Sequence, residues 1–191
     1  MKIGILGFQG AFVEHERHIG RLGYEPVVVR YPQQLDDLDG IILPGGESTT
    51  MGKLLCCTGM LEPLRNKIQE GLPVWGTCAG MILLAKKLEN DPVRHLALMD
   101  ITVKRNAYGT QIDSFDVSVE IPKVSPDPIP LVFIRAPYIT ESGANVEVLC
   151  KVEGHIVAAR ERHLLATSFH PELTDDSSFH RYFAEMCKKR E

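Results

Sequence analysis

Residues 74–84 read Val-Trp-Gly-Thr-Cys-Ala-Gly-Met-Ile-Leu-Leu. The stretch begins with apolar residues that favour a short strand and ends with apolar residues that favour a helix. Between them, Gly76 lies two residues before Cys78 and Gly80 lies two residues after it. Because glycine carries no side chain, this spacing predicts a sharp strand-to-helix turn at Cys78. Such a turn exposes a nucleophile above the end of a sheet. The N-terminus of the following helix favours a thiolate, so Cys78 is a candidate for covalent catalysis.

Strand and helix patterns alternate through the first half of the chain. The residues predict strands at 2–7, 26–30, 38–43 and 74–75, and helices at 11–22, from about 48, at 61–70 and at 79–88. This alternation indicates a parallel sheet with helices on both faces.

After residue 100 the pattern changes to strands with few helices between them. We predict strands at 101–103, 115–121, 131–134, 146–152, 156–159 and 163–169, and a closing helix at 177–188. Residues 1–191 are therefore expected to form a single α/β domain of three layers around a central mixed, mostly parallel sheet.

The composition indicates a globular protein from a reducing compartment. The chain has 191 residues, of which 44% are hydrophobic, enough to fill one core. A net charge of −4 gives no sign of a nucleic-acid partner. The five cysteines include no C-x-x-C pair, which argues against a structural zinc site and a disulfide framework. We expect a cytoplasmic protein without signal peptide, membrane span, metal or cofactor.

Three glycines near the N-terminus could suggest a dinucleotide site. Gly4, Gly7 and Gly10 follow the spacing G-x-x-G-x-x-G, whereas the dinucleotide fingerprint is G-x-G-x-x-G. We interpret them as a packing loop.

A thiolate that attacks a carbonyl needs a base, a group that orients the base, and donors for the developing oxyanion. The base candidate is His170, in Ser-Phe-His-Pro-Glu at 168–172. Pro171 disfavours helical geometry at His170, and in an extended segment residues i and i+2 point to the same side. Glu172 is therefore predicted to hold the imidazole of His170. In a chain without the strand-to-helix turn at Cys78, a His-Pro-Glu segment would more often be a surface turn than part of an active site.

Backbone N–H groups are the expected oxyanion donors. Ala79, directly after the nucleophile, is the first candidate, and Gly46 in Pro-Gly-Gly at 44–46 is the second, because glycines after a strand let the backbone approach a ligand closely. Taken alone, these glycines would indicate no more than a tight strand-to-helix turn.

Two other clusters of reactive side chains are interpreted as structural. His15 and His18 lie in Glu-His-Glu-Arg-His at 14–18, which is typical of a solvated helix face rather than a metal site. Cys56 and Cys57 are interpreted as helix packing.

Three segments resemble the class I, or triad, glutamine amidotransferases. They are Pro-Gly-Gly-Glu-Ser-Thr-Thr at 44–50, Gly-Thr-Cys-Ala-Gly at 76–80 and Ser-Phe-His-Pro-Glu at 168–172. Further motifs resemble one subfamily, the glutaminase subunits of pyridoxal phosphate synthases. They are Leu-Gly-Phe-Gln-Gly at 6–10 with Glu14 and His15, Arg-Asn-Ala-Tyr-Gly at 105–109 with Asp-Ser-Phe at 113–115, and Phe-Ile-Arg-Ala-Pro at 133–137. The resemblance runs from residue 2 to about residue 186.

The resemblance implies a flavodoxin-like fold and a reaction. Cys78 attacks the side-chain amide of L-glutamine, ammonia leaves, and a γ-glutamyl thioester is hydrolysed to glutamate, with His170 and Glu172 completing the triad. It also implies a glutamine pocket lined by Gly46, Glu47, Ser48, Arg105, Ile134 and Arg135. The ammonia passes to a (β/α)8-barrel synthase subunit in a large hetero-oligomer.

Several points stay open at this level. The residues do not say which arginine meets the carboxylate of glutamine, or whether Glu47 meets its ammonium group. Thr110 stands where the family usually has an arginine, which affects contacts made by that side chain. Gln9, Gly10 and the helix at 11–22 are candidates for partner docking. Activity without the partner is expected to be weak.

Two other functions fit the cysteine turn. One is the glutaminase subunit of another pathway, such as histidine or guanine nucleotide synthesis. The other is a cysteine-based redox sensor of related fold, in which a His-Pro-Glu segment after a late strand is not expected.

Overall fold

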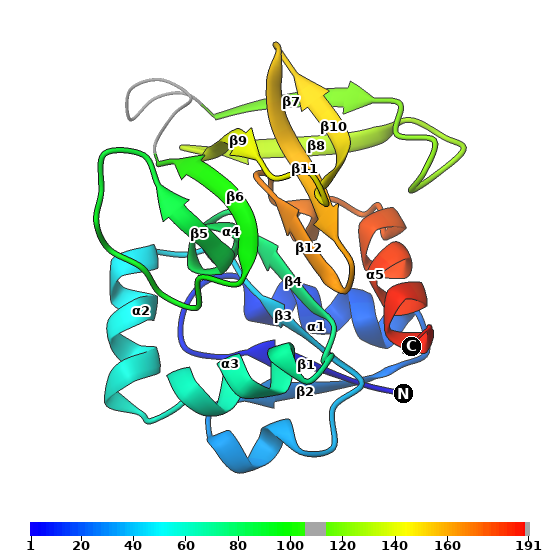
Figure 1. Ribbon diagram of the computed structural model, residues 1–191. Helices are drawn as coiled ribbons and strands as arrows, with labels where there is room; N and C mark the ends of the chain where they lie inside the picture. The colour runs from blue at the N-terminus through cyan, green and yellow to red at the C-terminus, as the bar shows by residue number, and fades with distance from the viewer. Residues whose placement is uncertain (106–113, 190–191) are drawn as a thin grey trace.

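The computed structural model describes residues 1–105 and 114–189, and strands alternate with helices through its first half (Figure 1). The strands there are β1 (Lys2–Leu6), β2 (Glu25–Val29), β3 (Gly40–Leu43) and β4 (Val74–Thr77). The helices are α1 (Phe12–Arg21), α2 (Ser48–Cys57), α3 (Leu61–Gln69) and α4 (Ala79–Leu84), with a 3₁₀ turn, η1 (Pro32–Leu35). All four strands and all four helices overlap the ranges that the sequence predicts, although the last helix is shorter than predicted.

The second half is rich in strands. They are β5 (Ala85–Leu88), β6 (Met99–Lys104), β7 (Ser114–Val119), β8 (Ile129–Ile134), β9 (Tyr138–Ser142), β10 (Glu147–Val152), β11 (His155–Glu161) and β12 (Leu164–Thr167). A 3₁₀ turn, η2 (Pro171–Leu173), and α5 (Ser178–Lys188) follow. No helix within residues 1–105 and 114–189 combines the length and apolar character needed to cross a membrane.

The described strands form one mixed sheet of ten strands and a separate hairpin. The order in the large sheet is β2-β1-β3-β4-β12-β11-β9-β6-β5, with β10 paired to β11. From β2 to β12 all pairings are parallel, whereas those joining β12, β11, β9 and β6, and that of β10, are antiparallel. β5 and β6 pair in parallel, and β7 with β8 makes the hairpin. The prediction of a mixed, mostly parallel α/β sheet is confirmed.

Helices cover both faces of the parallel region, as Figure 1 shows. β3, β4 and β12 are buried along their whole length because parallel strands are covered on both sides. One apolar core lies between the sheet and α2, α3 and α4, and includes Leu55, Leu64 and Leu83. The other lies beneath α1 and α5 and includes Trp75 and Phe183. The parallel strands direct their carboxyl ends to one edge, where an α/β protein places its ligands.

Two local predictions were incomplete. The helix predicted at 79–88 ends at Leu84, and residues 85–88 form β5, which pairs with β6. This pairing overrides the helix propensity of Lys86 and Lys87. The strand β9 was not predicted at all, although it joins β6 to β11 in the sheet.

The turn after β4 brings α4 against β3. A Cβ atom on Gly80 would lie only 2.0 Å from the carbonyl oxygen of Leu43, which is backbone and cannot move aside cheaply. A methyl group there must separate α4 from the sheet. On α1, by contrast, a Cβ on Gly20 would meet nothing within 4 Å.

These two glycines are expected to respond to alanine with opposite signs. Gly80→Ala should lower the free energy of unfolding by about 1–3 kcal/mol because it overpacks a close contact. Gly20→Ala should raise it by roughly 0.5–1 kcal/mol because alanine favours the helix. Urea unfolding of both variants measures the two changes. Equal changes of the same sign would contradict the close packing of α4 on β3.

Candidate active site

Cys78 lies at the sharp turn that its two glycines predict. It follows β4 and precedes α4, with φ 48° and ψ −103°, a strained conformation for a residue with a side chain. Its N–H donates to the carbonyl oxygen of Thr167 in β12 at 2.8 Å. Its own carbonyl accepts from the N–H of Met81 at 3.1 Å. Both sides of the turn are thus fixed, and Cys78 keeps 8% of its surface exposed.

A histidine and a carboxylate stand beside this turn. Nδ1 of His170 lies 2.7 Å from Oε1 of Glu172, whose side chain is fully buried. The N–H of His170 donates to the carbonyl of Val132 in β8 at 2.8 Å. The predicted contact between His170 and Glu172 is present, but the predicted extended backbone is not, because residues 171–173 form the 3₁₀ turn η2. This tight turn brings the two side chains together.

Cys78, His170 and Glu172 influence one another's protonation. Burial lowers the pKa of His170, but hydrogen bonds and charge from Cys78 and Glu172 outweigh it and raise that pKa to about 10. Burial raises the pKa of Glu172, but its interactions with His15 and His170 outweigh this effect and lower that pKa. The site therefore favours a protonated His170 and an ionised Glu172 beside Cys78.

A pocket of about 480 Å³ opens above Cys78. Its lining includes nine sequence-predicted site residues: Gly46, Glu47, Ser48, Cys78, Ala79, Arg105, Ile134, Arg135 and His170. Glu172 lies behind His170, out of the pocket wall. The structure thus brings every predicted site residue to one place.

Three further residues line the pocket, Gln9, Ile82 and Pro137. The sequence pointed to Gln9 only as a candidate for partner docking. Ile82 lies one helical turn beyond Cys78, so helical spacing is the signal that could have indicated it. Pro137 lies in the connection between β8 and β9 and ends the Phe-Ile-Arg-Ala-Pro motif at 133–137.

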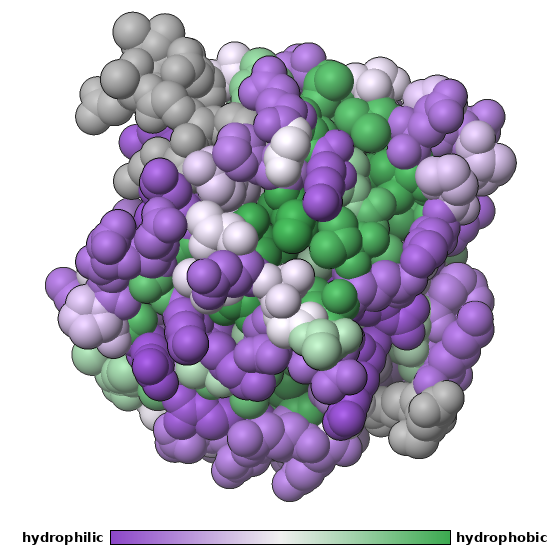
Figure 2. Space-filling view, turned by 45° about the horizontal axis from the view of Figure 1, so that its top comes forward, coloured by the Kyte–Doolittle hydropathy of each residue, from purple (hydrophilic) through white to green (hydrophobic). Residues whose placement is uncertain are grey.

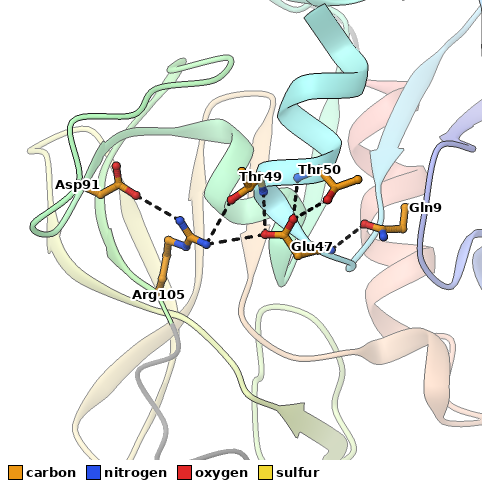
Figure 3. Close-up of polar contacts among 6 residues, drawn as sticks. All are labelled: Gln9, Glu47, Thr49, Thr50, Asp91 and Arg105. Carbon is orange, nitrogen blue, oxygen red and sulfur yellow. Dashed lines mark hydrogen bonds and ion pairs between the residues drawn. The ribbon is translucent and has the colours of Figure 1, made fainter. Parts of the chain in front are cut away.

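Glu47 caps the helix that forms one wall of the pocket (Figure 3). Its carboxylate accepts from the backbone N–H groups of Thr49 at 3.0 Å and Thr50 at 2.7 Å, and from the Thr50 hydroxyl at 2.7 Å. The hydroxyl of Thr50 is the main reason why the pKa of Glu47 falls to about 2, with the backbone N–H groups adding to it. The helix was predicted to begin at about residue 48, and the Glu47 side chain caps it there.

Arg105 lines the pocket and lies between two carboxylates, as Figure 3 shows. Its guanidinium lies 3.2 Å from Asp91 and 3.8 Å from Glu47. On the other side of Glu47, the side-chain oxygen of Gln9 accepts the Glu47 N–H at 2.9 Å. Arg135 joins Arg105 in the lining and adopts φ 44°, a strained value for arginine. The motif that follows Arg105, at 106–113 and including Thr110, lies outside the described residues.

Two structural interpretations of the sequence were wrong. His15 and His18 are 0% and 2% exposed, so they do not form a solvated face. They share the i, i+3, i+4 spacing with Ile19, and this spacing marks the buried face of α1. Cys56 and Cys57 are exposed on α2 rather than packed.

The chain is similar to known proteins over almost its whole length. It is 60% identical over 188 residues to pyridoxal 5'-phosphate synthase subunit PdxT of Clostridium kluyveri, covering 98% of this chain and 100% of that one. The protein of the same name from Carboxydothermus hydrogenoformans is 57% identical over 189 residues, with 98% and 99% covered.

Solved structures share the fold. A crystal structure described as a glutamine amidotransferase aligns with a TM-score of 0.92 and 42% identity, over 97% of this chain and 98% of that chain. A component of a putative GMP synthase from Thermoplasma acidophilum aligns with a TM-score of 0.71 at 18% identity, over 98% and 94%, which shows a shared fold alone. The model of the SNO glutamine amidotransferase family matches residues 5–189. The chain therefore belongs to the SNO glutamine amidotransferase family.

Proposed function

We propose that this chain hydrolyses L-glutamine to L-glutamate and ammonia and delivers the ammonia to the synthase subunit of pyridoxal 5'-phosphate synthase. The observation that carries the proposal is the meeting of Cys78, on a strained turn, with the pair of His170 and Glu172 at the base of one pocket. Membership of a glutamine amidotransferase family and the names of the relatives support the substrate and the pathway.

The chemistry begins with attack of the Cys78 thiolate on the side-chain amide carbon of glutamine. Negative charge develops on the amide oxygen, and the N–H groups of Ala79 and Gly46 are the donors that we propose for it. Ala79 is the first residue of α4, so its N–H has no partner within the helix. His170, protonated beside the thiolate, then gives a proton to the departing nitrogen.

The thioester formed on Cys78 is hydrolysed in the second half of the reaction. His170, now neutral, takes a proton from water, and the resulting hydroxide attacks the thioester carbon. Glutamate leaves, and the thiolate–imidazolium pair is restored. Glu172 holds Nδ1 of His170 throughout, so Nε2 stays directed at the reacting atoms.

The charged residues that line the pocket can bind the two charged groups of a free amino acid. Glutamine carries an α-carboxylate and an α-ammonium group, and each needs a partner where water is excluded. Arg105 and Arg135 are the candidates for the carboxylate, since a guanidinium binds it in a bidentate manner. Glu47 stays ionised and is the candidate for the ammonium group. Ser48 and Ile134 complete the pocket wall.

The partner we propose is a (β/α)8-barrel synthase subunit, in a large hetero-oligomer in the cytoplasm, with residues 1–191 acting as one glutaminase domain. Figure 2 looks toward the strand-rich end of the molecule and shows hydrophobic residues in its centre, bordered by hydrophilic ones. Half-buried apolar side chains of β7 and β10, among them Val117 and Leu149, occur at this end. Apolar surface of this kind supports a protein partner.

The test is ammonia release by the purified chain alone and with each of three synthase subunits. These subunits come from the pathways to pyridoxal 5'-phosphate, GMP and histidine. We expect weak release by the chain alone and strong stimulation only by the subunit from the pyridoxal 5'-phosphate pathway. Stimulation only by one of the other two subunits would reject the proposed pathway. No release with any of the three, together with reversible oxidation of Cys78, would favour a redox sensor.

A further inference from the structure

A row of buried histidines lies behind the proposed triad. His15 and His18 on α1 and His180 on α5 are at most 2% exposed. Nδ1 of His15 lies 2.9 Å from Nε2 of His180, and Nε2 of His15 lies 3.5 Å from Oε2 of Glu172. The row therefore extends from α5 through α1 to the carboxylate that holds His170.

The two oxygens of Glu172 have different neighbours. Oε1 holds Nδ1 of His170, whereas Oε2 is buried and has no conventional hydrogen-bond partner among the described residues. Nε2 of His15 is also buried without such a partner, and it faces Oε2 of Glu172. An ionised oxygen buried without a donor is costly, so a small shift that closes this contact is favoured.

The position of the proton on His15 follows from this contact. A proton on Nδ1 would leave lone pairs on Nε2 of His15 and Oε2 of Glu172 facing each other. A proton on Nε2 gives Glu172 a donor and leaves Nδ1 of His15 to accept the Nε2–H of His180. The contact with Glu172 thus selects the tautomer of His15, and the tautomer of His180 follows from it.

The surroundings keep His15 neutral. Burial lowers its pKa to about 4, although Glu172 and Glu14 act to raise that pKa, and His18 and His170 lower it further. Burial, together with the neighbouring rings of His15 and His18, also lowers the pKa of His180 well below its usual value. A neutral imidazole carries one N–H, so His15 can donate in only one direction.

We infer that His15 is a positioning residue of the active site, whose Nε2–H donates to Oε2 of Glu172 from behind. The inference rests on the proposed catalytic role of Cys78, His170 and Glu172. With one oxygen held by His170 and the other by His15, the Glu172 carboxylate cannot rotate, and the imidazole of His170 stays aligned with Cys78. His15 itself lines no part of the pocket.

The chain offers a matched control in His18. It lies one turn further along α1, is equally buried, and stacks on His180 with 4.2 Å between ring centroids. Its Nδ1 bonds to the hydroxyl of Ser177 at 2.8 Å, away from Glu172. His15→Phe and His18→Phe therefore remove a ring donor from the same cluster, but only the first removes the donor to Glu172.

Two further variants separate the donor from the ring. In His15→Gln the amide nitrogen takes the place of Nε2 and can still reach Glu172. In His15→Asn the shorter side chain places its nitrogen near the position of Nδ1, toward His180. The pair of amide variants decides the inference even if His15→Phe does not fold.

The variants are compared by two measurements. The first is glutamine turnover with the synthase subunit present. We expect His15→Phe and His15→Asn to lower kcat by about 10-fold to 100-fold through misalignment, with KM changed by less than about 2-fold. His15→Gln and His18→Phe should stay within about 3-fold of the unmodified chain.

The second measurement needs neither glutamine nor the synthase subunit. It is the rate of Cys78 alkylation by iodoacetamide across a pH series, read on the Cys78 peptide by mass spectrometry. His15→Phe and His15→Asn should slow alkylation at neutral pH, whereas His15→Gln and His18→Phe should not. If the unmodified chain releases no ammonia, the proposed function fails, and alkylation still decides the role of His15.

Unchanged turnover and alkylation in both His15→Phe and His15→Asn would overturn the inference. Equal losses in His15→Phe and His18→Phe would also overturn it, because they would indicate that the cluster acts only through stability. So would a fully folded His15→Gln that is as slow as His15→Asn.

Discussion

Replacing Cys78 with alanine is expected to abolish glutamine hydrolysis while leaving the fold and partner binding intact. Alanine removes one sulfur atom that faces the pocket, so little packing is lost. Without a thiolate no thioester can form, and the rate should fall by at least about 10⁴-fold. Ammonia release in the presence of the synthase subunit, together with urea unfolding of the purified variant, measures both properties.

Cys150 provides the matched control. It is a buried cysteine on β10, outside the pocket, and burial raises the pKa of its thiol to about 11. Such a thiol is inert. Cys150→Ala should therefore leave the rate per folded molecule unchanged and lower the free energy of unfolding by about 1 kcal/mol through the cavity it creates. Residual activity in Cys78→Ala equal to that in Cys150→Ala would contradict the assignment of the nucleophile.

Replacing His170 with asparagine is expected to cost almost as much as replacing Cys78. The asparagine cannot accept and return a proton, and it removes the counter-charge beside the thiolate. We expect a loss of about 10³-fold to 10⁵-fold in kcat. Since the two residues act as a unit, the double variant should be no slower than Cys78→Ala alone, which distinguishes a shared mechanism from two separate defects.

The pH dependence of Cys78 alkylation tests the role of His170 in a second way. The pKa of His170 is raised to about 10, so its imidazole stays protonated through the neutral range and supports a thiolate there. Alkylation of Cys78 at pH near 7 should be fast in the unmodified chain and slow in His170→Asn. Equal alkylation rates at neutral pH would show that His170 does not stabilise the thiolate.

The strand-to-helix turn was predictable because its requirements are local. Gly76 and Gly80 are close in sequence to Cys78, and their function is steric: a Cβ on Gly76 would lie 2.4 Å from the carbonyl carbon of Gly80. The contact between His170 and Glu172 was also predicted, although on the wrong backbone geometry. The side chains of residues 170 and 172 can meet both in an extended segment and in the 3₁₀ turn η2, so the predicted contact is correct although the predicted backbone is not.

The remaining errors arise where distant segments decide the outcome. His15 and His18 belong to a charged stretch, so their helical spacing with Ile19 gave only a weak signal, and the packing of α1 against α5 and η2 is what buries their face. Residues 85–88 would suit a helix, but their pairing with β6 makes them a strand. The positioning role proposed for His15 depends on contacts 157 and 165 residues apart in the sequence (172 − 15 and 180 − 15), which no local pattern reveals.

Arg105 shows how far a family motif can guide an interpretation. The motif predicted that Arg105 lines the pocket, and it does. Its ion pair with Asp91 was not predicted, because Asp91 lies in a connection between β5 and β6 that carries no motif. Both carboxylates beside Arg105 hold its guanidinium in the pocket lining, where the proposed substrate carboxylate would compete with them for it.

The proposed attack of Cys78 on the side-chain amide carbon of glutamine is tested most directly with the glutamine analogue 6-diazo-5-oxo-norleucine. The chain and the synthase subunit are incubated with the analogue, and the adduct is located by peptide mass spectrometry. We expect one adduct, on Cys78, that excess glutamine prevents. An unlabelled Cys78, or an adduct on the exposed Cys56 and Cys57 that glutamine does not prevent, would contradict it.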